Sequence, residues 1–349
     1  MICPKCQTTN PDPHRYCLQC GTRLGEKQKR TRAKGSVSDM MATGIALFNE
    51  GNFHGALEEF KACAQVDPLH ELSHLYGGVC SLALGELGAA RDHAKKAATL
   101  NPKLQGAGFL LGLLEALEEE KSAAAQHFER CHELNPEFVL SLHWAGLLLI
   151  QERKFSRARP VVDKLLARKP DSAAAHYMAG VLDSEEGDLD SAVTRLERAV
   201  ELLDDFTAAH RKLAQVYVDL HQKESAARHY GRVVELDRTD SESAFRLGVL
   251  LSDLRDVDGA IGMFRRAIDI NPRFSEAHYQ IGLLLYVEKG SIDEALDEVE
   301  RALELDPADP SARLIMGEIL YDKKIVDESR KTPAERAKSA GAKKATRRT

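Results

Sequence analysis

Aromatic residues and long apolar runs are both scarce in this chain. Phe, Trp and Tyr make up 6% of the 349 residues, and Trp144 is the one tryptophan. No stretch reaches eighteen uninterrupted apolar residues, so no membrane-spanning helix is expected. The chain starts Met1-Ile2-Cys3 without a signal-peptide pattern, which leads us to expect a cytoplasmic location.

Catalytic sequence motifs are also missing. The chain has no phosphate-binding GxxxxGK[ST], no GxGxxG after a strand, no HExxH and no GxSxG. Acidic runs such as Glu118 to Glu120 have the character of solvated helix faces. We therefore expect neither an enzyme nor a small-molecule substrate.

What the chain does contain is a strict repeat. A very small residue recurs every 34 residues, and its positions are Gly44, Gly78, Gly112, Gly146, Gly180, Ala214, Gly248 and Gly282. A fixed period of this length is typical of a solenoid built from one supersecondary unit. Such a protein offers an extended surface to partners and lacks a closed reaction pocket.

Each unit reads as two amphipathic helices. Counting from Val37, apolar residues at positions 4, 7, 8 and 11 form one helix face, and positions 20, 24 and 27 form another. Position 8 is the small residue, position 20 is Ala in the first seven units and shifts by one residue to Ala295 in the eighth, and position 24 is mostly large and apolar. The small residues let two helix backbones approach, and the large one fills the remaining space. Proline at position 32 in most units ends the second helix.

This pattern resembles the tetratricopeptide repeat, as in Leu247-Gly248 with Ala260, Phe264 and Pro272. The resemblance implies an all-α, right-handed superhelical solenoid of eight helix pairs with a C-terminal capping helix. The expected boundaries are repeats at 37–70, 71–104, 105–138, 139–172, 173–206, 207–240, 241–274 and 275–309, a capping helix at 310–324 and a basic tail at 325–349.

Histidine replaces the family's usual tryptophan at position 4 in four units. These residues are His74, His176, His210 and His278. They lie on separate helices, and no carboxylate recurs in the same phase. We therefore interpret them as packing residues and not as metal ligands or catalytic groups.

Four of the seven cysteines form a metal-binding pattern near the N-terminus. Cys3 and Cys6 make one CxxC pair, and Cys17 and Cys20 make a second pair after ten residues. Two converging CxxC pairs are typical of a four-thiolate zinc site, which has no open position and is structural. The remaining three, Cys63, Cys80 and Cys131, are expected to be buried thiols.

The segment from Cys3 to Leu24 also resembles the small bacterial zinc ribbon, so we expect a ribbon at 1–24 and a basic linker at 25–36. Gln7 and Tyr16 differ from that pattern, but neither stands at one of the four ligand positions. Disulfides, a redox CxxC, His14 as a ligand, or iron in place of zinc remain alternatives.

Charge is strongly segregated along the chain. The net charge is −6, but residues 1–36 carry about +6 and residues 330–349 about +7, so the repeats between them are near −19. Basic ends of this kind allow contact with nucleic acid or an acidic surface.

The family resemblance also implies where a partner would bind. In tetratricopeptide repeats, first-helix positions 2, 5, 6, 9, 12 and 13 line a concave groove. The candidate groove residues are Leu75, Tyr76, Phe109, Leu110, His143, Trp144, Tyr177, Met178, Arg211, Lys212 and Arg246. The apolar members predict an amphipathic helix or extended apolar segment, and the basic ones an acidic stretch. The alternative is that much of this surface packs within the superhelix.

Two functional hypotheses follow. The first is a non-enzymatic protein-interaction scaffold with the zinc ribbon as an accessory module. The second is a nucleic-acid-associated adaptor that uses the ribbon and the basic ends, although no aromatic residues interleave with the cations there for base stacking.

Overall fold

The protein is all-helical in the part that the structure describes. The computed structural model describes residues 6–9 and 36–330, and all seventeen elements within them are α-helices. The expected zinc ribbon and linker fall almost wholly outside the described residues. None of the helices in the described ranges combines the length and the apolar character that a bilayer crossing needs.

The chain divides into two compact units, Met1–Leu182 and Asp183–Thr349. The division falls inside α9, at a place where the repeat pattern predicted one uninterrupted array. The helices of the first unit are α1 (Val37–Asn49), α2 (Phe53–Val66), α3 (Glu71–Ala83), α4 (Leu87–Leu100), α5 (Gln105–Leu117), α6 (Lys121–Leu134), α7 (Val139–Gln151), α8 (Phe155–Arg168) and the start of α9 (Ala173–Glu186).

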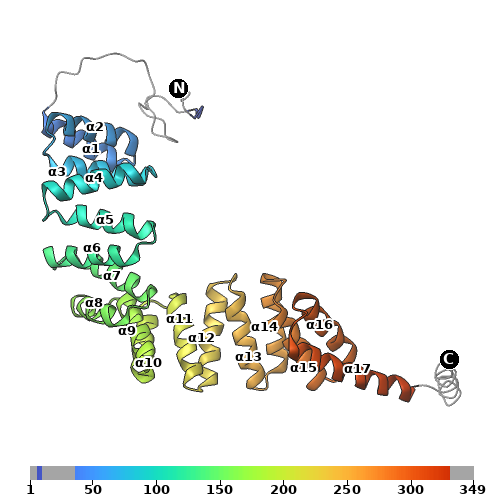
Figure 1. Ribbon diagram of the computed structural model, residues 1–349. Coiled ribbons are helices and arrows are strands. Elements are labelled where there is room, and N and C mark those ends of the chain that lie inside the picture. Colours follow the sequence, from blue (N-terminus) through green and yellow to red (C-terminus); the bar gives the residue numbers. More distant parts are fainter. Residues whose placement is uncertain (1–5, 10–35, 331–349) are drawn as a thin grey trace. The chain divides into compact units, whose positions relative to one another are not determined.

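The second unit continues with the end of α9 and eight further helices. They are α10 (Leu189–Leu202), α11 (Thr207–Asp219), α12 (Lys223–Leu236), α13 (Ser241–Asp253), α14 (Val257–Ile270), α15 (Ser275–Val287), α16 (Ile292–Leu305) and α17 (Pro310–Arg330). From α1 to α8 in the first unit, and from α10 to α17 in the second, each helix packs against the next one in the chain (Figure 1). From α1 to α15 the first helices begin every 34 residues, as the sequence period predicted.

The turn inside each helix pair has a fixed backbone conformation. One residue per turn has a positive φ, such as Gly51 at 73°, Gly85 at 76° and Gly187 at 85°. The same turn position in other pairs carries Glu119 at 65° or His221 at 58°. Since only glycine adopts this conformation without steric cost, those non-glycine turns are locally strained.

Helix ends are closed by short polar side chains. Ser36 and Asp39 form a reciprocal capping box at the start of α1, in which the Ser36 hydroxyl accepts from the Asp39 N–H at 3.1 Å and Asp39 Oδ2 accepts from the Ser36 N–H at 3.1 Å. Asp240 caps α13 and Asp256 caps α14, each accepting from the N–H three residues later. These contacts satisfy backbone donors that a helix leaves unpaired at its first turn.

The core repeats the packing that residue sizes predicted. The second-helix alanines, Ala56 to Ala260 in steps of 34, are fully buried. A Cβ built on Gly112 would lie 2.8 Å from Phe128 Cε1, and one on Gly248 would lie 2.7 Å from Phe264 Cε1. Both phenylalanine rings are completely buried. Glycine is therefore required where the second helix inserts its ring against the first.

The last helix is longer than predicted. A capping helix at 310–324 was expected, but α17 runs to Arg330. Residues 322–330 contain no glycine or proline and include the apolar pair Ile325 and Val326, so nothing local stops the helix.

Candidate partner-binding surface

In the first unit, six of the predicted groove residues form a half-buried apolar surface on the first helices. We call this surface the aromatic face, and it consists of Leu75, Tyr76, Phe109, His143, Trp144 and Tyr177. Each of these residues is partly accessible to solvent. The surface is therefore partly packed and partly open to solvent.

Three rings of the aromatic face, those of Tyr76, Phe109 and Trp144, each lie against a phenylalanine ring of a second helix. Tyr76 stacks on Phe60, with ring centroids 5.2 Å apart. Phe109 lies 5.0 Å from Phe128, and Trp144 lies 6.3 Å from the same Phe128 ring. This support fixes the ring orientations before any partner arrives, which lowers the entropy cost of binding.

His143 contributes to the apolar character of the face. Its ring meets Trp144 edge-on, with centroids 6.4 Å apart and planes at 90°. Burial lowers the pKa of His143 below its usual value. The ring is therefore neutral at pH 7 and does not add a charge to the surface.

Two predicted groove residues, Leu110 and Met178, are not available to a partner. Their exposed fractions are 2% and 1%. Leu110 Cδ2 lies 2.8 Å from a Cβ built on Gly78, and Met178 Sδ lies 3.2 Å from one built on Gly146. Both side chains reach back to the small residue of the preceding repeat, so they are core residues and the groove prediction is wrong for them.

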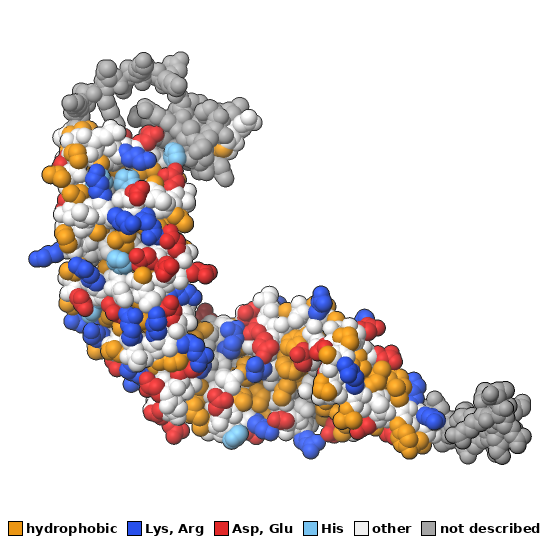
Figure 2. All heavy atoms as spheres, in the orientation of Figure 1, with side chains coloured by type: hydrophobic (Ala, Val, Ile, Leu, Met, Phe, Trp, Pro, Cys, Tyr) orange, Lys and Arg blue, Asp and Glu red, His pale blue; other side chains and the backbone are white. Residues whose placement is uncertain are grey.

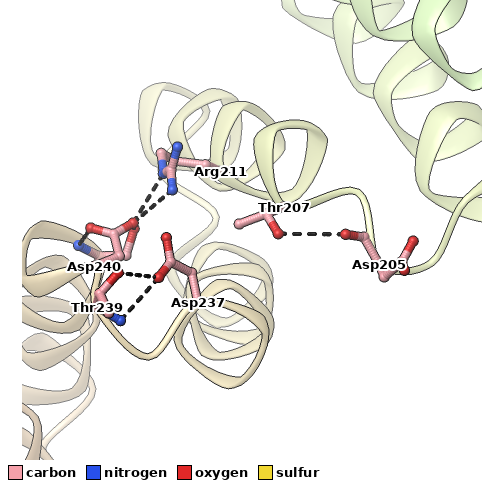
Figure 3. Close-up of polar contacts among 7 residues, drawn as sticks. Asp205, Thr207, Arg211, Asp237, Thr239 and Asp240 are labelled. Carbon is pink, nitrogen blue, oxygen red and sulfur yellow. Dashed lines mark hydrogen bonds and ion pairs between the residues drawn. The ribbon is translucent and has the colours of Figure 1, made fainter. Parts of the chain in front are cut away.

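The three basic residues predicted for the groove, all in the second unit, already have acidic partners. Arg211 contacts Asp240 Oδ2 through Nη2 at 2.8 Å and through Nε at 3.1 Å (Figure 3). Lys212 Nζ lies 3.3 Å from Glu185 Oε1, and Arg246 Nη2 lies 2.7 Å from Glu242 Oε1. A partner's acidic stretch would have to displace these pairs, so they do not form a ready anion site.

The ion pair between Arg211 and Asp240 is stabilised by further hydrogen bonds to the Asp240 carboxylate. The carboxylate lies at the start of α13, where it accepts from the Ser243 N–H at 2.9 Å and the Ser243 hydroxyl at 2.6 Å. Partial burial raises its pKa, but the hydrogen bonds from Ser243 and the charge of Arg211 outweigh burial, and the net shift is downward. The turn before α13 contains a further hydrogen bond, which the Thr239 hydroxyl donates to Asp237 Oδ1 at 2.7 Å (Figure 3).

Of the position-4 histidines, His74, His210 and His278 are buried and His176 is half-buried, as expected for packing residues, and His278 Nδ1 also lies 2.7 Å from Glu298 Oε2. His176 Nε2 lies 2.8 Å from the Pro170 carbonyl oxygen, and His210 Nε2 lies 2.9 Å from that of Asp204. A carbonyl only accepts, so Nε2 carries the proton in both. His210 Nδ1 then faces His229 Nδ1 at 3.0 Å. These bonds tie a first helix to the turn before it and to its own second helix.

Of the four predicted zinc ligands, the described residues include Cys6. Cys3, Cys17 and Cys20 lie outside the described residues, while Cys6 is exposed and its thiol donates to Thr8 Oγ1 at 3.3 Å. Across residues 6–9 and 36–326, no group of three or more His, Cys, Asp or Glu side chains is placed to hold a metal ion. The other thiols, Cys63, Cys80 and Cys131, are buried as predicted.

Solved structures similar to this one are helical repeat proteins. A crystal structure of YrrB, titled a TPR protein with an unusual peptide-binding site, matches with 26% identity over 57% of this chain and 99% of that chain, at a TM-score of 0.50. A tetratricopeptide repeat protein from Parabacteroides merdae covers 71% of this chain and 98% of its own at 17% identity, with a TM-score of 0.51. PilF of Pseudomonas aeruginosa covers 65% of this chain and 99% of its own at 17% identity, also with a TM-score of 0.51.

Sequence comparison agrees with these structures. No curated protein matches the chain. The family model described as "Tetratricopeptide repeat" matches residues 41–104, 145–206, 211–273 and 279–345, which together make up well over half of the chain. With its 34-residue helix pairs and its glycine-to-phenylalanine packing, the chain belongs to the tetratricopeptide repeat family.

Proposed function

We propose that this protein is a non-enzymatic scaffold that binds an apolar segment of a protein partner on the aromatic face of its first unit. Tetratricopeptide repeat proteins generally mediate protein–protein interaction. The observation that carries the proposal is the aromatic face itself, where supported rings from successive first helices remain partly open to solvent. Contiguous apolar surface of this kind is costly in water and typically marks a docking site.

The chemistry of the face favours an amphipathic helix or an extended apolar segment. Its residues are apolar or, in the case of His143, neutral. Tyr and Trp are also the side chains that most often dominate binding energy at interfaces. The peptide-binding site named for YrrB, which is 26% identical to this chain, is consistent with the same mode of recognition.

Selection from a random peptide library on the full-length protein tests this proposal. We expect enriched peptides to be apolar and to shift the fluorescence of Trp144, the one tryptophan in the chain. The variants Trp144→Glu and Phe109→Glu, read out by anisotropy of labelled peptide, should each weaken binding by at least about tenfold, because each places a charge against a buried apolar contact.

A matched control is Leu134→Glu, which adds the same charge at an exposed leucine of the second helix α6. This variant should bind normally. The proposal fails if the enriched peptides bind Trp144→Glu and Phe109→Glu as tightly as the unchanged protein.

We also propose that Cys3, Cys6, Cys17 and Cys20 hold one structural zinc ion as an accessory module. Four thiolates in two CxxC pairs suit tetrahedral zinc, and a segment this short needs metal to fold. Thiol counting tests the idea sharply, because the other three cysteines are buried and burial raises the pKa values of Cys80 and Cys131 to about 11.

In the folded protein, a chelator should expose four reactive thiols and release one zinc per chain. Cys63, Cys80 and Cys131 should react only after unfolding. Four thiols that react without a chelator, in protein purified under reducing conditions, would contradict the zinc proposal.

A further inference from the structure

A surface without charge runs across four first helices of the first unit. Positions 2, 5, 6, 9, 12 and 13 of each repeat, counted from Val37, lie on one side of a first helix because they recur at helical spacing. In α1, α3, α5 and α7, none of these six positions holds Lys, Arg, Asp or Glu. We call this surface the uncharged stripe. It contains the aromatic-face residues of α3, α5 and α7.

The lack of charge distinguishes the stripe from the rest of the protein. Charged residues make up 29% of the sequence. The same positions of α11, α13 and α15 in the second unit hold seven charged residues, with Arg211 and Glu242 among them. On the face seen in Figure 2, acidic and basic side chains are interspersed with hydrophobic ones along both units. A partner on the stripe therefore meets no ion pair to break and no counter-charge for charged groups of its own.

The stripe is continuous from helix to helix. Phe48 of α1 and Tyr76 of α3 lie edge to face, with ring centroids 5.9 Å apart. Leu75 Cδ2 of α3 lies 2.9 Å from a Cβ built on Gly106 of α5. Consecutive first helices therefore present their stripe positions side by side.

This continuity extends to α7, and nearly all of the stripe is accessible to solvent. Phe109 of α5 and Trp144 of α7 lie against the same Phe128 ring, at centroid distances of 5.0 and 6.3 Å. Met41 and Leu110 are the two stripe residues that are buried, and every other one is partly or fully exposed. Apolar surface as extensive as this is costly in water unless a partner covers it.

The stripe is wider than the apolar side of an amphipathic helix. The first helices α3 and α5 contact each other, and packed helices lie about 10 Å apart, so four first helices span roughly 30 Å. Along each helix, the stripe positions cover about 16 Å at about 1.5 Å per residue. An apolar arc of about 100° on a helix about 10 Å across is only about 9 Å wide. Charged residues flanking such an arc would lie over the stripe and lose water without gaining a partner.

The stripe also cannot pair the backbone of a partner. In α3 and α5, the Tyr76 hydroxyl is the only side-chain hydrogen-bonding group at the stripe positions, and the helix backbones bond within themselves. An extended segment would leave N–H and C=O groups unpaired against this surface, which is costly. An α-helix pairs these groups internally, so a helix is the conformation that suits the stripe.

The terminal segments of the chain do not supply such a helix. In residues 1–35 and 331–349, the longest run free of Lys, Arg, Asp and Glu is the seven residues from Tyr16 to Thr22. A helix of that length measures roughly 10 Å, about a third of the span of the stripe. Any longer piece of these segments would place cations over the stripe, where no acid stands to pair with them.

We propose that the uncharged stripe binds an α-helix of about 20 residues from another protein that carries no charge on any side, the kind of segment that spans a bilayer. Such a helix is about 30 Å long, which matches the span of the four first helices. Binding here takes apolar surface of the segment out of water while the segment is outside a membrane. This inference rests on the proposed function, since the aromatic face is part of the stripe, and it narrows the partner to one chemical class.

Two labelled helical peptides, added to the full-length protein, test the inference. The uncharged probe has a run of Leu and Ala about 20 residues long between Lys pairs that keep it soluble. The amphipathic probe keeps one Leu stripe but carries Glu and Lys on its other side. Anisotropy should show the uncharged probe binding at least about tenfold more tightly, because the flanking charges of the other probe lose water.

Variants at the two edges of the stripe separate the probes further. Leu117 and Leu140 are 59% and 50% exposed and lie at opposite edges, at positions 13 and 2. Leu117→Glu and Leu140→Glu should each weaken the uncharged probe at least about fivefold and leave the narrower amphipathic probe unchanged. Leu203→Glu is the matched control, because it adds the same charge at a 45% exposed leucine where α10 ends in the second unit. It should bind both probes normally.

Four results would overturn the inference. Equal affinity of the two probes, with both weakened by Trp144→Glu, would do so and leave the proposed function intact. Absence of binding by both probes would also do so, and the peptide-library selection then decides the proposed function separately. Flotation of the protein with phosphatidylcholine vesicles that Leu117→Glu abolishes would make a membrane surface the occupant. A dimer in sedimentation that Leu140→Glu dissociates would make a second copy of the chain the occupant.

Discussion

Alanine at Gly112 is the sharpest test of why the 34-residue period holds a glycine. A Cβ there would lie 2.8, 3.0 and 3.1 Å from three carbons of the Phe128 ring, which is completely buried. The ring has no space to retreat, so Gly112→Ala should lose about 1–3 kcal/mol to overpacking. Helix propensity returns about 1 kcal/mol, since alanine is the better helix former. The net loss is therefore about 0–2 kcal/mol.

The decisive measurement is a double-mutant cycle with Phe128→Ala. That change alone should cost about 3–5 kcal/mol, as expected for a buried phenylalanine. Once the ring is gone, Gly112→Ala should stabilise the unit by about 1 kcal/mol through propensity alone. The two sites should thus couple by about 1–3 kcal/mol.

Urea unfolding followed by Trp144 fluorescence suits this cycle, because Trp144 lies 6.3 Å from Phe128. Gly317→Ala, with nothing within 4 Å of the new Cβ, is the control and should be stabilising by about 1 kcal/mol in circular dichroism. Additive effects of Gly112→Ala and Phe128→Ala would refute the close-approach explanation.

Three further predictions concern local features. Burial, aided by the nearby charges of His210 and Arg228, lowers the pKa of His229 from 6.5 to about 4. The folded state therefore resists protonation of His229, so the free energy of unfolding should be full above pH 6.5 and fall by about 3 kcal/mol as the pH drops to 4. His229→Gln should reduce this loss in denaturation curves recorded at several pH values. Glu119→Gly and His221→Gly should each stabilise by about 0.5–1 kcal/mol, because their φ angles of 65° and 58° suit glycine, and a lower melting temperature would contradict this. Ser36→Ala should cost about 1 kcal/mol and speed amide exchange in the first turn of α1, whereas unchanged exchange would mean that the capping box is not stabilising.

Much of the fold could be predicted from residue spacing because the contacts that define the repeat lie within one 34-residue unit. Gly44, Ala56 and Phe60 lie within one 34-residue unit, and the contacts among them are set by side-chain size along two adjacent helices. The helix starts from α1 to α15 follow from this spacing. The six-residue extension of α17 did not, because the end of that helix is marked by no breaker.

The candidate site was harder to predict because adjacent positions on a first helix can differ in solvent exposure. Phe109 and Leu110 are adjacent and both apolar, yet the first stays partly open while the second is 2% exposed. The spacing could not separate them, since the difference depends on Leu110 reaching the glycine of the preceding repeat. The ion pair between Arg211 and Asp240 was missed for a similar reason, because it joins α11 to the residue that caps α13, 29 positions later.

The sequence by itself determined the helix pairs, the tight glycine contacts and the packing role of the position-4 histidines, because these depend on residue size and period inside one unit. Only the tertiary structure decided which apolar side chains remain accessible and which cations are already neutralised. Those properties depend on what the next repeat places against each helix.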